Sequence, residues 1–230
     1  MSNLEHWQPA QLPDARALNG RFVRLEKLDA ARHADGLWQA LEGPNADPKL
    51  WDYLAVGPFT DRSTFDAYLV GLQASTDPWF YTVVDQQTGV IDGFLSLMSI
   101  VPSAGRIEIG HVTFGASMQR SPKSTEAVYL LANESFALGN RRLEWKCNAD
   151  NARSMSAAKR FGFSFEGVFR QHLVVKGKNR NTAWFSIIDG EWASLEKAFT
   201  QWLAVDNFDN GQQIRTLADL RMLNASNSGS

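Results

Sequence analysis

The sequence has little or nothing of several features that mark particular classes of protein. It contains one cysteine, Cys147, in 230 residues, so no internal disulfide can form, which favours a reducing compartment. The formal net charge of -2 gives no global basic field for nucleic acid. No apolar run approaches the roughly 20 residues that a membrane helix needs. We therefore expect a soluble, cytoplasmic protein with neither a nucleic-acid nor a membrane partner.

Motifs for signal peptides, nucleotides and metals are also missing. The first 20 residues lack a basic stretch followed by an apolar one. A nucleotide-binding α/β domain has no support, because the chain contains neither a Walker pattern nor GxGxxG. The histidines show no ligand spacing, so we expect no metal. They are His6, His33, His111 and His172.

The apolar periodicity predicts a mixed α/β domain. The expected order is strand, two helices, three strands, helix, strand, helix, two strands and helix. We expect the domain over 20–204, after an N-terminal arm at 1–19. A C-terminal amphipathic segment and flexible tail occupies 205–230, and its last residues, NASNSGS, are expected to be disordered.

Turn and cap residues predict where the helices begin and end. Asp29, Asn151 and either Thr60 or Asp61 are expected N-caps. Gly139 is expected as the left-handed residue after a central helix that runs from about 125 to 138. This helix lies in the strand-helix-strand crossover of the chain.

A polar run immediately before the central helix is chemically unusual for a loop. A helix N-terminus attracts anions, and the cations of this run would make it a pyrophosphate cradle. The plain alternative is a solvated loop with Ser124 as the N-cap. Glu126 is an anion in the first turn and must point away from any phosphate. The candidate ligands are Gln119, Arg120, Ser121, Lys123, Ser124 and Thr125.

Three segments resemble the GNAT acetyltransferase superfamily, most closely its Rim-type branch, which includes the ribosomal-protein N-terminal acetyltransferases. They are QRSPKSTEA, NADNARSMSAAKRFGF and EGVFR, and the resemblance covers roughly 21–203. It implies a single domain whose central, mostly antiparallel twisted sheet is splayed at the acetyl-CoA site and flanked by helices. It also implies that an acetyl group passes from acetyl-CoA to a primary amine by direct attack on the thioester.

The resemblance implies positions for acetyl-CoA. Val112, Thr113 and Phe114 would run beside the pantetheine, and an N–H there would stabilise the oxyanion. The polar run would hold the pyrophosphate, although Pro122 and Ser124 stand where the family usually has glycine. Asn151 would bond the pantetheine amide.

The catalytic groups are less sharply indicated. Many family members carry a Tyr acid where this chain has Ala158, so Ser154 resembles the Rim-type alternative that protonates the thiolate. Glu108 is a candidate base, directly or through water, and is equally well read as a carboxylate on an exposed strand face. His111 is a neighbouring candidate, more often structural. Glu144 is expected to be a solvated strand charge.

The acceptor is bounded by amine pKa values. At pH 7 roughly one in seven α-amino groups is neutral, against roughly one in 2,500 lysines, which favours a protein N-terminus or a small amine. A non-catalytic acyl-CoA-binding protein that keeps the fold is the alternative, and a homodimer is left open. Candidate aromatic residues for an acceptor pocket are Trp38, Trp51, Tyr53 and Phe80.

Overall fold

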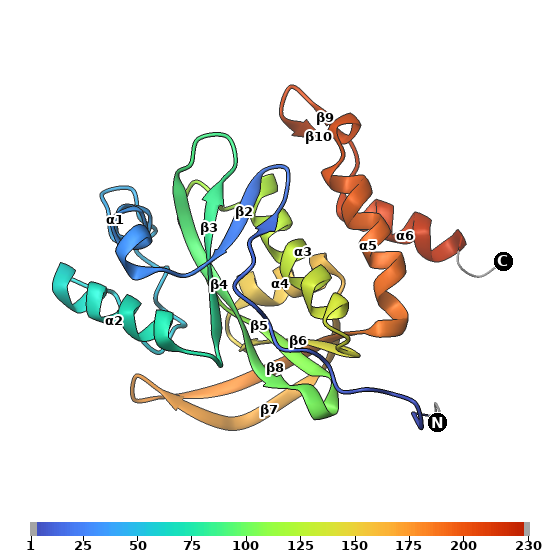
Figure 1. The fold of residues 1–230 in the computed structure, drawn as a ribbon, viewed down its shortest axis with the longest axis horizontal. Coiled ribbons are helices and arrows are strands. Elements are labelled where there is room, and N and C mark those ends of the chain that lie inside the picture. Colours follow the sequence, from blue (N-terminus) through green and yellow to red (C-terminus); the bar gives the residue numbers. More distant parts are fainter. Residues whose placement is uncertain (1–3, 228–230) are drawn as a thin grey trace.

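The computed structural model describes residues 4–227, which form a large sheet flanked by helices (Figure 1). The predicted fold class, a single mixed α/β domain with a mostly antiparallel sheet, is confirmed. The strand order is β1-β2-β3-β4-β5-β6-β8-β7. The strands of this sheet are β1 (Leu18–Asn19), β2 (Val23–Lys27), β3 (Trp79–Asp85), β4 (Ile91–Val101), β5 (Arg106–Phe114), β6 (Arg142–Asn148), β7 (Ser164–Val175) and β8 (Lys178–Ile188).

Helices cover both faces of the sheet, with α1 and α2 on one face and α3 and α5 on the other (Figure 1). The helices are α1 (Ala30–Leu41), α2 (Arg62–Ala74), α3 (Pro122–Ala137), α4 (Ala152–Phe161), α5 (Asp189–Leu203) and α6 (Leu217–Asn227). Short 3-10 helices η1 (Pro102–Ala104) and η2 (Val205–Asn207), and a small hairpin of β9 (Phe208–Asp209) and β10 (Gln212–Gln213), complete the elements. Within residues 4–227, no helix combines the length and the apolarity that crossing a bilayer demands.

The predicted helix caps are confirmed. The side chains of Asp29, Asp61 and Asn151 each accept a backbone N–H of the helix that follows. Gly139 follows α3 with φ +88°, a conformation that glycine adopts without steric cost. Local sequence therefore determines the start of α1, α2 and α4 and the turn after α3.

Two predicted boundaries are wrong. Helix α3 begins at Pro122, three residues before the expected start, because proline is well suited to the first helical position. Helix α6 continues through residues 224–227, which were expected to belong to a disordered tail. Residues 228–230 of that tail lie outside the described residues.

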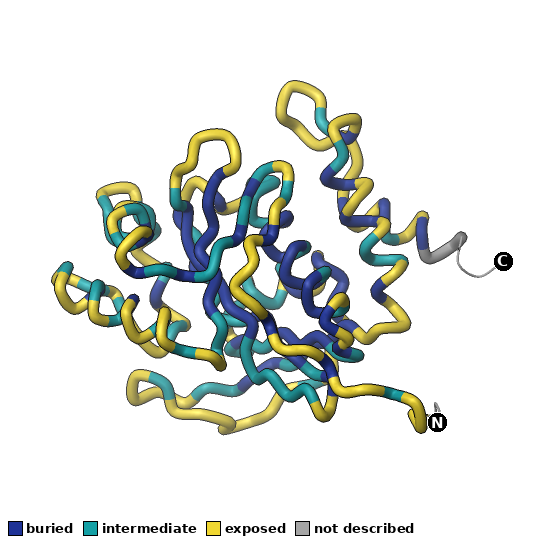
Figure 2. Tube along the Cα trace, viewed as in Figure 1, coloured by how far each residue is buried: buried dark blue, intermediate teal, exposed yellow. Residues whose placement is uncertain are grey.

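Two separate hydrophobic clusters lie on the two faces of the sheet. The larger one joins the inner strands to α3 and α5. The smaller one lies under α1 and α2 and includes Leu37, Phe65, Phe80 and Phe94. Figure 2 shows that burial follows the middle strands, whereas β7 at the edge is mostly exposed. The middle of the sheet is thus the rigid part to which the candidate site is attached.

Candidate functional site

Strands β5 and β6 form a fork. They pair in parallel from Arg106 and Arg142 to Glu108 and Glu144, and residues 4–227 contain no β5–β6 pairing beyond that point. Strand β5 nevertheless continues to Phe114, paired only with β4 along this second half. The edge of β5 that faces β6 is therefore without a strand partner over the segment that includes the predicted Val112, Thr113 and Phe114.

A bulge marks the second half of β5. Phe94 pairs with Thr113 and Ser96 pairs with Gly110, so β5 carries one residue more than β4 across this interval. His111 within the bulge has φ +48°, in the left-handed region that is uncommon for residues other than glycine. The bulge changes the direction of β5 at the point where it has left β6.

The N-terminus of α3 differs from those of α1, α2 and α4 because no side chain caps it. The N-cap position is Ser121, whose hydroxyl donates to the carbonyl of Met118 instead. Ser124 donates to the carbonyl of Ser121 and is not the N-cap. The first-turn N–H groups of α3 are thus left without a side-chain partner, as an anion-binding helix end requires.

The cations of the polar run differ in their contacts. Arg120 is exposed, has φ +59°, and makes no ion pair or hydrogen bond with the described part of the chain. The Lys123 ammonium lies 2.6 Å from Asp85 Oδ2 and 2.7 Å from Asp92 Oδ2. Burial acts to lower the pKa of Lys123, but the bonds to Asp85 and Asp92 leave that pKa raised. Arg120 is the cation of this run that remains available to a ligand.

Two further side chains of the run have partners inside the protein. Thr125 is buried, and its hydroxyl accepts a hydrogen bond of 2.9 Å from Arg160, which ties α3 to α4. The Gln119 amide lies 3.4 Å from Asp47 Oδ2. The polar run therefore lies beside α4, and the side chains of Thr125 and Gln119 are already bonded to other parts of the protein.

Glu126 points away from the loop, as predicted. Its carboxylate is buried and accepts the backbone N–H groups of Arg21, Phe22 and Val23 at 2.6 to 2.8 Å. These contacts attach α3 to the start of β2. The negative charge of Glu126 is thereby removed from the candidate phosphate site.

Helix α4 presents the second predicted group of site residues. Asn151 Oδ1 accepts the Ser154 N–H at 3.1 Å, and Ser154 Oγ accepts the Trp145 indole N–H at 3.0 Å. The hydroxyl proton of Ser154 is therefore left to donate elsewhere. Cys147 is buried, and burial raises the pKa of its thiol, although Ser154 acts to lower it.

A buried ion cluster occupies the base of the fork. Lys146 Nζ lies 2.8 Å from Glu108 Oε2 and 2.9 Å from Glu144 Oε2. Glu108 also accepts the Ser99 hydroxyl at 3.0 Å. The expectation that Glu144 is a solvated charge is wrong, because it is buried, accepts a hydrogen bond from Arg142 and forms an ion pair with Lys146. The alternation of β6 predicts a surface position for Glu144, but charged side chains of β5 and β6 surround its carboxylate.

The loop over 42–61 connects α1 to α2, and the sequence analysis identified only its Trp51 and Tyr53, as candidates for an acceptor pocket. Asp47 Oδ2 accepts from Arg153 of α4 at 3.2 Å, on the same oxygen that Gln119 approaches. The Tyr53 hydroxyl donates to the Asp150 carbonyl at 3.1 Å. Lys176, at the tip of the β7–β8 hairpin, donates to two carbonyls of the loop. The length of this loop was the available signal, since long structureless loops are often functional.

A cavity of about 300 Å³ lies between this loop, α2 and the second half of β5. Of the aromatic candidates, Phe80 lines it. Trp51 and Trp38 instead pack against Phe59 and Phe65. The lining residues are Leu54, Ala55, Val56, Tyr68, Gly71, Leu72, Ser75, Pro78, Phe80, His111 and Thr113.

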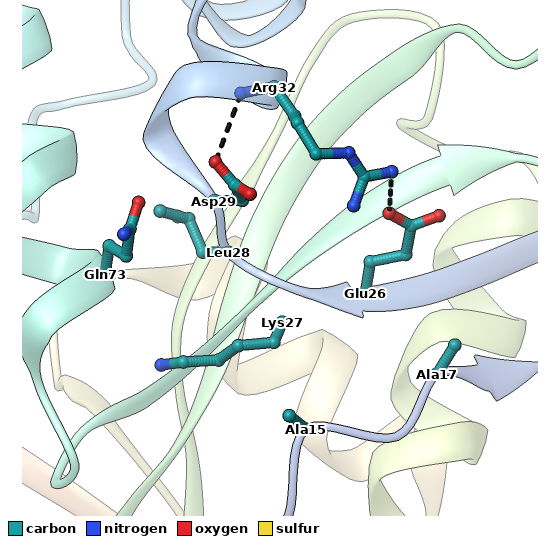
Figure 3. A pocket seen from close by; sticks show the side chains of 8 residues that line it. All are labelled: Ala15, Ala17, Glu26, Lys27, Leu28, Asp29, Arg32 and Gln73. Carbon is teal, nitrogen blue, oxygen red and sulfur yellow. Dashed lines mark hydrogen bonds and ion pairs between the residues drawn. The ribbon is translucent and has the colours of Figure 1, made fainter.

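A second hollow of about 460 Å³ opens between the N-terminal arm, the end of β2 and the start of α1 (Figure 3). Its charged groups already have partners: Arg32 bonds Glu26 at 2.8 Å, and Lys27 lies 4.0 Å from the ring centre of Trp79. It contains none of the predicted site residues. Among residues 4–227 no group of three or more His, Cys, Asp or Glu is placed to hold a metal.

Comparison with known proteins agrees with this geometry. The model of the acetyltransferase (GNAT) domain matches residues 23–164. A GCN5-related N-acetyltransferase from Brucella melitensis is 43% identical with a TM-score of 0.91, over 95% of this chain and 100% of that one. A probable GNAT-family acetyltransferase from Chromobacterium violaceum is 41% identical with a TM-score of 0.78, over 84% and 96%.

A Rim-type structure is a more distant neighbour. The acetyl transferase of Salmonella typhimurium that modifies the N-terminal serine of ribosomal protein L7/L12 has a TM-score of 0.64 and 21% identity, over 75% of this chain and 99% of that one. At this identity the likeness bears on the fold alone.

Proposed function

Because the chain belongs to the GNAT acetyltransferase family and is an N-acetyltransferase, we propose that it moves an acetyl group from acetyl-CoA to a primary amine. The amine would attack the thioester directly, without an acetylated enzyme residue. The observation that carries this proposal is the fork of β5 and β6, beside which lies the uncapped start of α3. The acceptor would be a protein N-terminus or a small amine.

The polar run supplies the donor set that a pyrophosphate needs. The uncapped first turn of α3 offers N–H groups and a partial positive charge, and Arg120 offers a cation without an internal partner. Ser121 and Ser124 can rotate their hydroxyls toward a ligand. Lys123 would contribute through its N–H and charge while its ammonium stays between Asp85 and Asp92. Gln119 and Thr125 would complete the set, with Thr125 acting through the first turn of α3.

The fork supplies the remaining chemistry. An N–H of Val112, Thr113 or Phe114 on the unpaired edge of β5 would stabilise the oxyanion. Asn151 would bond the pantetheine amide while it caps α4. Ser154 would donate its hydroxyl proton to the leaving thiolate, because its oxygen already accepts from Trp145.

Glu108 is the base proposed from the sequence. In the structure its carboxylate bonds Lys146 and Ser99 at the base of the fork, so it would have to act through water while it keeps these bonds. The Rim-type branch also stays a proposal, supported by the Asn151–Ser154 pair in place of a tyrosine acid.

Acetyl-CoA binding by Arg120→Ala tests the proposal. We expect affinity, measured by calorimetry, to fall about tenfold, and more at low salt, because one charge-assisted phosphate contact is lost. Arg170→Ala, which removes an exposed cation on β7, is the matched control and should bind normally. If wild-type protein neither binds acetyl-CoA nor releases thiol with any amine, the proposed function is wrong.

A further inference from the structure

The cavity of about 300 Å³ beside β5 has a lining unlike the rest of the candidate site. It is apolar apart from Ser75, Thr113, the Tyr68 hydroxyl and one imidazole. We propose that this cavity takes the acceptor, a primary amine on an apolar group without a second charge, and that His111 Nε2 accepts its proton. This inference rests on the proposed acetyl transfer and names its substrate class and its base.

The position of the cavity fits an acceptor. His111 and Thr113 of its wall belong to the half of β5 that has left β6, next to Val112. The proposed oxyanion donor is an N–H of this same segment. An amine in the cavity would therefore approach the edge of β5 at which the thioester carbonyl is proposed to lie.

The fold orients the His111 ring. The left-handed φ of +48° and the bulge direct residue 111 differently from its neighbours on β5. The Nδ1 atom lies 3.0 Å from Ser96 Oγ, and the ring centre lies 5.1 Å from that of Phe80. When Nδ1–H donates to Ser96, the lone pair is on Nε2, which has no partner within the described residues.

The surroundings of His111 keep it neutral. Burial lowers the pKa of the imidazole below its ordinary value of about 6.5. Tyr68 is the other titratable group in the lining, and burial raises its pKa to about 12. The lining from the 42–61 loop, α2, β3 and β5 contains no Asp, Glu, Lys or Arg. A neutral imidazole is therefore present at neutral pH to take a proton.

The same lining selects the amine. A carboxylate or a second ammonium on the acceptor would lose its water inside the cavity without gaining a charged partner. The volume of about 300 Å³ admits a branched aliphatic or single aromatic group. An apolar N-terminal residue and a free apolar monoamine share this chemistry.

The proposed step balances in atoms and protons. The amine nitrogen forms a bond to the thioester carbonyl carbon, and its proton passes to His111 Nε2. The carbon–sulfur bond breaks, and the thiolate gains a proton from Ser154, which is reprotonated from solvent. His111 then returns its proton to solvent. The products are an amide and the free thiol of coenzyme A.

An amine panel with thiol release as the readout tests the substrate class. We expect phenethylamine and isopentylamine to give kcat/KM at least about tenfold above cadaverine and lysine. A leucyl tripeptide carries an isobutyl side chain similar to the apolar group of isopentylamine. Comparing kcat/KM for these two acceptors therefore distinguishes a peptide N-terminus from a free amine as the substrate. A preference for the charged amines would overturn the inference while leaving acetyl transfer established.

Gly71→Leu tests the cavity itself. A Cβ at Gly71 meets no atom within 4 Å, and the residue lines the cavity from α2, so we expect leucine to fit the helix and to occupy part of the cavity. We expect KM for phenethylamine to rise about tenfold while acetyl-CoA affinity stays unchanged. Val70→Leu, an exposed neighbour that does not line the cavity, is the control. Equal kinetics in both variants would place the acceptor elsewhere.

His111→Asn tests the base. Asparagine tolerates left-handed φ, so the fold should be kept, and melting curves check this. We expect kcat/KM to fall about a hundredfold or more, and its acid-side decline to become shallower, because only the decline caused by protonation of the amine remains. His172→Asn is the control, since His172 also contacts a hydroxyl at 3.0 Å, on Thr182, but lies outside the cavity. A folded His111→Asn enzyme with the wild-type pH profile would overturn the assignment.

Discussion

The two halves of β5 are built from one strand and have opposite properties. From Arg106 to Glu108 the strand pairs with both β4 and β6, and its buried carboxylate is neutralised by Lys146. Within residues 4–227, the strand from Gly110 to Phe114 pairs with β4 alone, contains a bulge, and holds an imidazole nitrogen without a hydrogen-bond partner. Regular pairing on both sides satisfies polar groups within the protein. The loss of one neighbour leaves such groups available to a ligand.

The largest effect is expected from breaking the regular half. Lys146→Met would leave Glu108 and Glu144 buried without their shared cation, and we expect a loss of about 3–5 kcal/mol in the free energy of unfolding. Urea unfolding at neutral pH measures this loss. The control is Lys178→Met, an exposed lysine on β8, which should change stability by no more than about 0.5 kcal/mol. Equal stability of both variants would show that the cluster is solvated.

A somewhat smaller effect is expected in the bulged half. Gly93 pairs with Phe114, has φ +147°, and an added Cβ would lie 2.3 Å from the Thr113 carbonyl oxygen. We expect Gly93→Ala to cost about 2–4 kcal/mol, measured by thermal unfolding. Gly89→Ala has φ +73° but no atom within 4 Å of the new Cβ, so it should cost only about 1 kcal/mol. A result in which Gly89→Ala is the more harmful variant would contradict the close approach.

The pH dependence of the free energy of unfolding should distinguish the two halves of β5, through His111 in the second half and Glu144 beside the first. Burial lowers the pKa of His111, so its contribution to folding is complete above about pH 6.5 and is lost as pH falls through the lowered value. Burial acts to raise the pKa of Glu144, but Arg142 and Lys146 leave it lowered, so its contribution is lost only below about pH 4.3.

Urea unfolding across this pH range tests the separation. The stability difference between wild type and His111→Asn should shrink below about pH 6.5, and that for Glu144→Gln only below about pH 4.3. Differences that stay constant with pH would show that neither group is perturbed by folding.

The smallest effect on stability is expected where β6 leads into α4. Aspartate caps a helix as well as asparagine does, so Asn151→Asp should keep stability within about 0.5 kcal/mol. We expect kcat to fall, because aspartate lacks the amide donor and adds charge near the thiolate. Ser154→Ala should also lower kcat with little change in acetyl-CoA affinity. Wild-type kcat in both variants would make α4 a purely structural helix.

Local chemistry explains which parts were predictable from sequence. The caps at Asp29, Asp61 and Asn151 depend on bonds within a few residues, so the order of elements and the family resemblance followed from short segments. The partners of Lys123 and Glu144 depend on strands distant in sequence, and no periodicity reveals them. The cavity proposed for the acceptor was predicted only through Phe80, because its wall combines residues of the 42–61 loop, α2, β3 and β5.

The loop over 42–61 takes part in two neighbourhoods at once. Its Asp47 lies against Gln119 and Arg153, while its Leu54, Ala55 and Val56 form one wall of the cavity. A ligand that displaces Asp47 acts on the same segment that a ligand in the cavity contacts. The two binding free energies are then linked, and each ligand changes the affinity of the other by the same factor. With acetyl-CoA and the acceptor placed as proposed, this loop would couple the binding of the two substrates within a single chain.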